Sequence, residues 1–65
     1  AQGVVEVVVR GRDVDAVMRN GSQRARSLPA PWVAVVVAAI TGRELPAVRR
    51  ALRSGQARFT PEAAL

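Results

Sequence analysis

Hydrophobic positions in this 65-residue chain form two apolar blocks that flank a polar, basic stretch. The first block, VVEVVVR at residues 4–10, consists mostly of β-branched valine and predicts a strand. Only Glu6 interrupts the valines, so both faces of this strand are apolar. A strand of that kind is prone to aggregate unless another strand or another chain pairs with it.

The polar stretch predicts a short helix followed by a linker. Asp13 is a suitable N-cap for a helix over residues 13–20, whose apolar stripe is formed by valines and a methionine at helical spacing. The Asn20-Gly21 pair then predicts the C-terminal end of this helix. Residues 22–27, SQRARS, have the composition of a basic linker.

The second apolar block, WVAVVVAAI at residues 32–40, is compatible with a helix or with a strand. Pro31, the alanines and the glycine that follows favour a helix, whereas four valines in five positions favour a strand. Periodicity does not separate the two in so short a run, and we expect the helix. The segment has no polar side, so the strand of residues 4–9 or a second subunit is needed to cover it.

A further helical pattern starts at Glu44 and ends at Gly55. Its apolar side chains recur at helical spacing: Leu45, Val48, Ala51 and Leu52. Residues 56–59 are expected to form a loop or a short extended segment. Thr60-Pro61-Glu62 then has the pattern of one more helix start.

The segment around Gly42 has the spacing of a helix-turn-helix. Ala38 supplies a small residue where two helices touch, Gly42 can adopt positive φ at the turn, and Val48 with Leu52 fixes the second helix. Three arginines lie off that apolar side, free to meet phosphates or base edges: Arg49, Arg50 and Arg53.

We therefore expect a mainly α fold: a small single domain with a short N-terminal β-strand and a helix-turn-helix core. Residues 1–27 hold the strand, the short helix and the basic linker. Residues 28–65 form the helical, helix-turn-helix-like domain.

Several of these residues also fall at the spacings of a known family. They are the Val37-Ala38 pair, Gly42, Val48, Arg50 and Leu52, followed by Gly55 and the segment Phe59-Thr60-Pro61-Glu62. In these residues the second half of the chain resembles the DNA-binding headpiece of lac-repressor-type transcription regulators. The resemblance implies that the major groove is faced by Leu45, Pro46, Arg49 and Arg50, and the DNA backbone by Arg43, Arg53 and Arg58.

The chain departs from that family at the start of the second helix. Arg43 and Glu44 stand where the family has an apolar residue and then Ser or Thr. Pro46 occupies a position that normally offers a base-contacting side chain, which argues against sequence-specific recognition.

Charge supports a polyanionic partner. The net charge is +5, with a pI near 11.8, and all ten basic residues are arginine. Guanidinium groups suit phosphate and guanine, although codon usage in a GC-rich genome also explains arginine in place of lysine. A small basic protein attracts polyanions at long range, and nucleic acid is the first candidate.

Composition excludes most catalytic and metal chemistry. The chain has no histidine, cysteine, lysine or tyrosine, and it is too short to enclose a pocket while also burying a core. We expect no enzymatic activity, no cofactor and no metal. The longest uncharged stretch, residues 27–42, contains two prolines and is too short to span a bilayer as a helix of about 20 residues.

The sequence thus favours a small basic protein that binds double-stranded DNA, of the phage or bacterial regulator, excision or packaging type, dimeric and cytoplasmic. The alternative is a structural or assembly subunit of a virion or larger complex, with the valine-rich segments as intermolecular contacts. That alternative ranks first if residues 32–40 form a strand.

Overall fold

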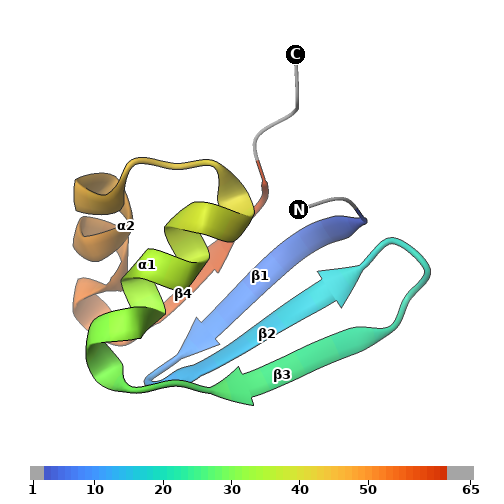
Figure 1. The fold of residues 1–65 in the computed structure, drawn as a ribbon, viewed down its shortest axis with the longest axis horizontal. Coiled ribbons are helices and arrows are strands. Elements are labelled where there is room, and N and C mark those ends of the chain that lie inside the picture. Colours follow the sequence, from blue (N-terminus) through green and yellow to red (C-terminus); the bar gives the residue numbers. More distant parts are fainter. Residues whose placement is uncertain (1–2, 62–65) are drawn as a thin grey trace.

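A computed structural model describes residues 3–61, which form an antiparallel four-stranded sheet with two helices on one of its faces (Figure 1). In chain order the elements are β1 (Val4–Arg10), β2 (Asp13–Met18), β3 (Gln23–Ser27), α1 (Ala30–Thr41), α2 (Leu45–Ala51), the 3-10 turn η1 (Leu52–Ser54) and β4 (Gln56–Phe59). The strand order is β3-β2-β1-β4. The expectation of a mainly α fold is therefore wrong, because as much of the chain is strand as helix.

β1 and β2 form a hairpin around the two-residue turn Gly11-Arg12, with Arg10 paired to Asp13. Gly11 has φ of 60°, and positive φ at the first central residue suits the twist of a tight hairpin. The helix predicted over residues 13–20 is thus wrong. Asp13 and Asp15 alternate with apolar neighbours on opposite faces of β2, so a period of two and not a helical stripe is the relevant pattern.

β3 extends the hairpin to a three-stranded meander and replaces the predicted linker. Each of its residues pairs with β2, yet all five are exposed. The loop before it is closed by the Asn20 side chain, whose Oδ1 accepts hydrogen bonds from the Ser22 backbone N–H at 3.0 Å and from Ser22 Oγ at 2.7 Å.

The helix prediction for residues 32–40 is confirmed by α1, which begins just before Pro31 and ends at Gly42. Gly42 has φ of 76° and donates its backbone N–H to the Ala38 carbonyl oxygen at 2.9 Å, as expected for a left-handed C-terminal cap. Thr41 is buried at the last turn, where Oγ1 donates to the Val37 carbonyl oxygen at 2.8 Å.

The chain bends by 117° between α1 and the segment made of α2 and η1. Val48 is fully buried on the inner side of α2, and Gly55 ends η1 with φ of 85°. The local helix–glycine–helix geometry expected around Gly42 is therefore present, although it is part of an α+β domain.

β4 joins the two halves of the chain, because it pairs with β1 from Val7–Phe59 to Arg10–Gln56. The described parts of the two predicted segments, residues 3–27 and 28–61, consequently share one sheet and one core. The buried apolar side chains are Val7, Val9, Val14, Val33, Ala34, Val37, Val48 and Phe59. β4 is the segment, residues 56–59, that was expected to form a loop or a short extended segment. The helix start predicted at Thr60-Pro61-Glu62 runs beyond the described residues.

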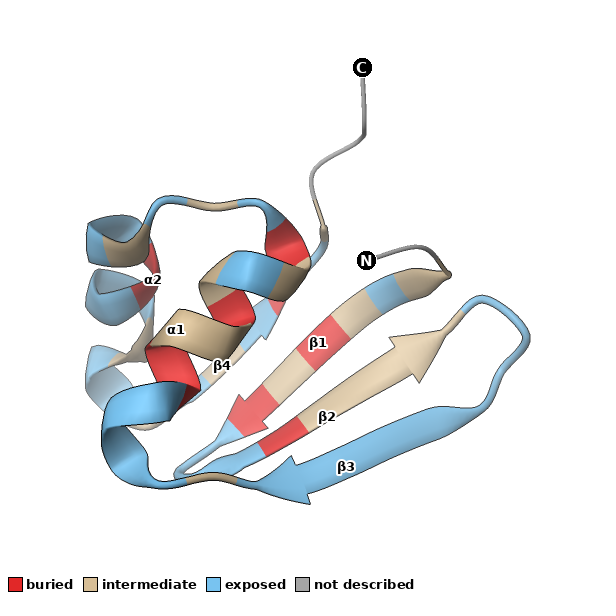
Figure 2. Cartoon of the chain, viewed as in Figure 1, coloured by how far each residue is buried: buried red, intermediate tan, exposed pale blue. Residues whose placement is uncertain are grey.

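The helical layer covers only part of the sheet. Figure 2 shows buried residues on α1 and α2 and on the neighbouring parts of β1 and β2, whereas β3 is exposed along its whole length. α1 packs against β1, β2 and α2, and η1 lies against β4. Neither described helix alone is long and apolar enough to cross a bilayer, and the pair that reaches such a length is sharply bent.

Candidate nucleic-acid interface

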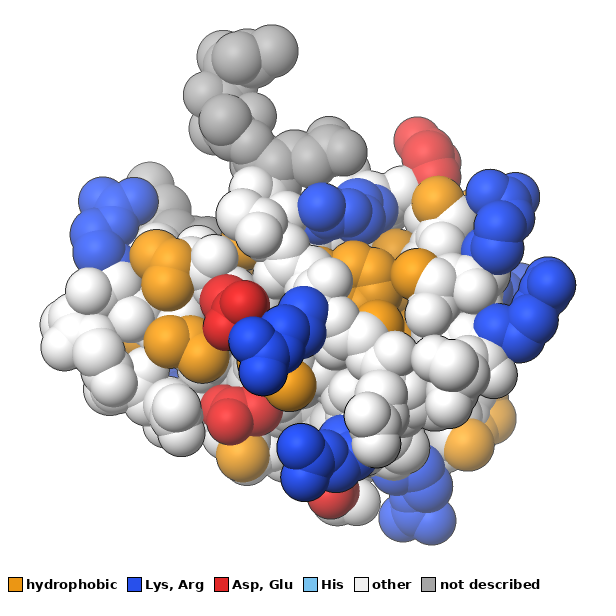
Figure 3. Space-filling view, turned by 180° about the vertical axis from the view of Figure 1, so that it is seen from behind, with side chains coloured by type: hydrophobic (Ala, Val, Ile, Leu, Met, Phe, Trp, Pro, Cys, Tyr) orange, Lys and Arg blue, Asp and Glu red, His pale blue; other side chains and the backbone are white. Residues whose placement is uncertain are grey.

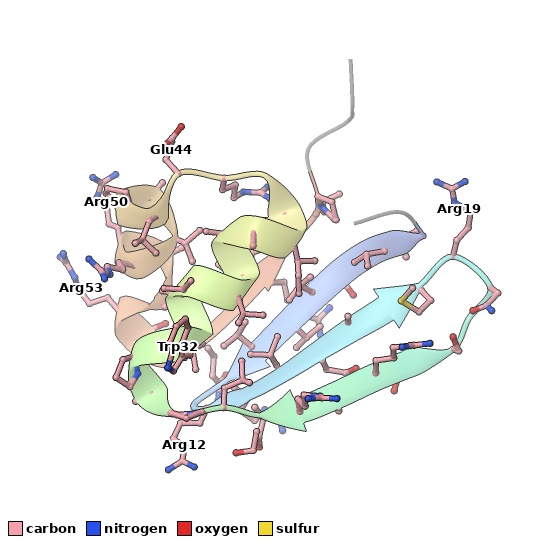
Figure 4. The ribbon with its side chains drawn as sticks, viewed as in Figure 1. Arg12, Arg19, Trp32, Glu44, Arg50 and Arg53 are labelled. Atoms are coloured by element: carbon pink, nitrogen blue, oxygen red, sulfur yellow. The ribbon has the colours of Figure 1, made fainter. Side chains whose placement is uncertain are left out.

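The two helices and η1 form a bent unit, here called the helical corner. Three arginines project from one side of it and are here called the α2 arginine face: Arg49, Arg50 and Arg53. All three are exposed, because burial of Val48 on the inner side turns the following residues outward. Figure 4 shows Arg50 and Arg53 extending away from the sheet. No acidic residue occurs between positions 45 and 54, so the charge of this face is uncompensated within its own elements.

A hollow of about 220 Å³ lies beside this face, between α1, α2 and the β1–β2 turn. Its two charged lining residues are Arg12 and Arg49. Its other walls are backbone and small or aliphatic side chains, formed by Gly11, Ala30, Val33, Ala34, Leu52 and Gly55. The hollow therefore brings together two arginines from segments that lie far apart in the sequence.

Backbone hydrogen bonds hold the segments around the hollow together. Gly11 donates its N–H to the Gly55 carbonyl oxygen at 2.7 Å, and Leu28 donates its N–H to the Arg12 carbonyl oxygen at 3.0 Å. Arg12 in turn donates Nε–H to the Leu28 carbonyl oxygen at 3.0 Å. That bond uses one of the five guanidinium donors and restricts where the other four can point.

Two other predicted DNA-contacting residues belong to the core side of the corner. Arg43 is half-buried, with its guanidinium carbon 5.5 Å from the centroid of the Phe59 ring. Its Nη1 is buried and has no hydrogen-bond partner among the described residues. Leu45 is also half-buried and packs against the core, so neither side chain lies on the α2 arginine face.

Arg58 lies on the opposite face of the sheet. It pairs with Val8, whereas the adjacent Phe59 pairs with Val7 in the core. On that open face basic and acidic side chains are interleaved, as Figure 3 shows. The strand register places there Arg10, Asp13, Asp15 and Arg58. The structure thus groups Arg49, Arg50 and Arg53 and separates them from Arg43, Leu45 and Arg58.

Arg12 was missed by the sequence reasoning. Its signal was the Gly11-Arg12 pair between two valine-containing runs, which marks a hairpin turn, but only the folded sheet brings that turn beside α2. Even with the turn recognised, the sequence does not show that Arg12 lies across the hollow from Arg49.

The arginines of this region have the chemistry to bind anions. Guanidinium groups stay protonated at all physiological pH values and donate paired hydrogen bonds to phosphate. Within residues 3–61 no group of three His, Cys, Asp or Glu side chains is placed to hold a metal ion. Comparisons with protein-family models, curated proteins and solved structures gave no match.

Proposed function

We propose that this domain binds double-stranded DNA through the α2 arginine face and Arg12, chiefly by contacts to the phosphate backbone. The observation that carries the proposal is that Arg12 and Arg49 line one hollow beside the exposed Arg50 and Arg53, without an acidic residue in α2 or η1. The open face of the sheet, where charges alternate in sign, offers no comparable surface.

The dimensions of an α-helix suit the major groove. A helix with its side chains is about 10–12 Å across, and the major groove is about 12 Å wide. Arginines on both α2 and the β1–β2 turn then reach phosphates on either side of the helix axis. The hollow between them accepts one phosphate group, held by Arg12 and Arg49.

Sequence recognition is weak in this arrangement. Leu45 packs inward, and Pro46 at the start of α2 has neither a backbone N–H nor a polar side chain to offer a base edge. Affinity therefore comes mainly from counterion release, which does not depend on the sequence. We expect unrelated duplexes of equal length to differ less than about tenfold in affinity, far below the range of about 10³ or more for specific binders.

The test is fluorescence anisotropy with a labelled duplex at two salt concentrations. With four phosphate contacts, affinity should fall about a hundredfold when salt rises from about 50 to about 200 mM. Changing Arg49, Arg50 and Arg53 together to Ala should abolish most of this salt dependence. Each lost phosphate contact should lower the slope of log affinity against log salt concentration by about one.

A charge-matched variant separates the α2 arginine face from net charge. Changing Arg10, Arg19 and Arg58 to Ala removes the same three charges, so that both triple variants have a net charge of +2 where the natural chain has +5. Only the α2 variant should lose binding, and thermal unfolding should be similar for both since all six side chains are exposed. Equal losses in the two variants would show that charge alone, without a defined face, governs binding.

A further inference from the structure

A second surface lies on the same side of the sheet as the helices, over the half that they leave uncovered. It is a groove of about 320 Å³ between α1 and the strands β2 and β3, here called the β2–β3 groove. Its lining is mostly aliphatic, and is formed by Val4, Val14, Ala16, Met18, Arg24, Ala25, Arg26, Leu28, Val36 and Ile40. Figure 1 shows that no helix lies over β3 on this side.

The dimensions of the sheet leave room for one more helix. Neighbouring strands lie about 4.8 Å apart and packed helices lie about 8–10 Å apart, so a helix covers about two strands. α1 packs on both β1 and β2, and η1 lies against β4, so the sheet surface beside α1 on the β3 side carries no described helix. A further helix packed beside α1 at the usual spacing would lie over β3 and the adjoining side of β2.

α1 itself has a second apolar side that residues 3–61 cover only in part. Trp32, Val36 and Ile40 follow each other at four-residue intervals and so lie along one side of the helix. Val36 and Ile40 line the β2–β3 groove, and Trp32 has 56% of its surface exposed. Large aromatic side chains left in solvent next to an apolar groove are typical of protein interfaces.

The charge of the groove selects among possible occupants. Arg24 pairs with Ala16 and Arg26 with Val14, so both arginines lie on the groove side of β3 and form its outer rim. None of the described lining residues is acidic. A second copy would bring its own arginine rim and a net charge of +5 against this surface, which is unfavourable.

An extended segment paired with the β3 edge is a poorer fit. It would satisfy the free backbone groups of that edge, but it would lie beyond the arginines and leave the aliphatic floor between β2 and α1 exposed. A helix laid in the groove covers that floor and brings its own edge against Arg24 and Arg26.

We propose that the β2–β3 groove binds an amphipathic helix of a partner protein that carries an apolar stripe and acidic residues along the edge facing β3. The apolar stripe packs on Ala16, Met18 and Val36, and the acidic edge pairs with Arg24 and Arg26. The β2–β3 groove shares no lining residue with the α2 arginine face or the hollow beside it, so this proposal does not rest on DNA binding.

The probes for this proposal are two crosslinked helical peptides of about 15 residues that differ only in charge. Both carry leucines at positions i, i+3, i+4 and i+7, and one has glutamate and the other lysine along one edge of the stripe. Emission of Trp32, the sole tryptophan, reports binding to the full 65-residue chain. The glutamate peptide should bind at least about tenfold more tightly than the lysine peptide, because two rim ion pairs contribute about that factor.

Charge reversal at the rim should invert this preference. The variant Arg24→Glu with Arg26→Glu should favour the lysine peptide by a similar factor. Its matched control is Arg10→Glu with Arg58→Glu, which makes the same charge change on the open face and brings the net charge from +5 to the same +1. The control should keep the preference for the glutamate peptide.

Amide chemical shifts of the labelled protein locate the bound peptide. Shifts confined to β2, β3 and the Val36 side of α1 support the proposal. It is overturned by binding of both peptides with equal affinity, by binding of neither at about 1 mM, or by shifts on the open face. A dimer in sedimentation that buries the groove would overturn it as well, since the occupant would then be a second copy.

Discussion

The helical corner and the three-stranded meander are held together by different means. At the corner, α1 and α2 bury Val33, Val37 and Val48 and keep their arginines outside. In the meander, burial decreases from β1, which has two buried valines, through β2, which has one, to β3, which has none. β3 is therefore held by backbone hydrogen bonds and its loop, with little hydrophobic contribution.

This gradient of burial predicts which part of the domain is most stable and which part opens first. Local opening is easiest where apolar contacts are few and backbone hydrogen bonds are exposed, which describes β3. The same lack of burial leaves the β2–β3 groove available, whereas the corner presents a fixed surface. We therefore expect the corner to hold its charged face in one shape and the β2–β3 groove to adapt more easily.

The largest effect is expected at the shared core under α1. Val7 is fully buried, so Val7→Asp places a carboxylate in the core and should destabilise the domain by about 4 kcal/mol or more, enough to unfold most of the population. Val8→Asp, one residue along the same strand, points to the open face between Asp15 and Arg58 and should cost about 1 kcal/mol. Urea titration followed by circular dichroism measures the free energy of unfolding of both variants. Equal losses of stability would contradict the assignment of Val7 to the core face of β1 and Val8 to its open face.

The two regions also differ in how far the sequence determines them. α1 and its end at Gly42 are specified by neighbouring residues, since a proline, an apolar run and a left-handed glycine act within one segment. β2 carries local signals for a helix and for a strand. Val14, Val17 and Met18 have helical spacing, while Asp13 and Asp15 alternate with apolar residues, and pairing with β1 decides in favour of the strand.

β3 has still less local information, because QRARS contains neither apolar alternation nor β-branched residues. Its best signal was Asn20-Gly21, a common hairpin turn, which was interpreted as a helix end. The arginines of α2 were predictable because α2 itself was. Arg12 and the arginine rim of the β2–β3 groove depend on strand pairing between distant segments, which one sequence does not reveal.

An intermediate effect is expected at the turn between the helices. Gly42 has φ of 76°, and a Cβ built there meets no atom within 4 Å, so Gly42→Ala is opposed by backbone strain alone. The loss of stability should be about 1–2 kcal/mol. D-alanine, which favours positive φ, should instead stabilise the chemically synthesised protein slightly. Thermal unfolding measures the difference, and equal melting temperatures for the two alanine enantiomers would contradict the left-handed cap.

The smallest effect is expected at the loop before β3. Asn20→Ala removes two hydrogen bonds to Ser22, but both are exposed, so the global free energy of unfolding should fall by only about 0.5 kcal/mol. The change should be visible instead in hydrogen exchange, where the β3 amides bonded to β2 lose protection and those of β1 bonded to β4 do not. Ser54→Ala is the matched control, because it removes a single exposed side-chain hydrogen bond, to the Gln56 carbonyl oxygen, at the other end of the sheet. If Asn20→Ala lowered protection uniformly through β1 and β4, then β3 would be part of the global folding unit, and the gradient of stability across the meander would not exist.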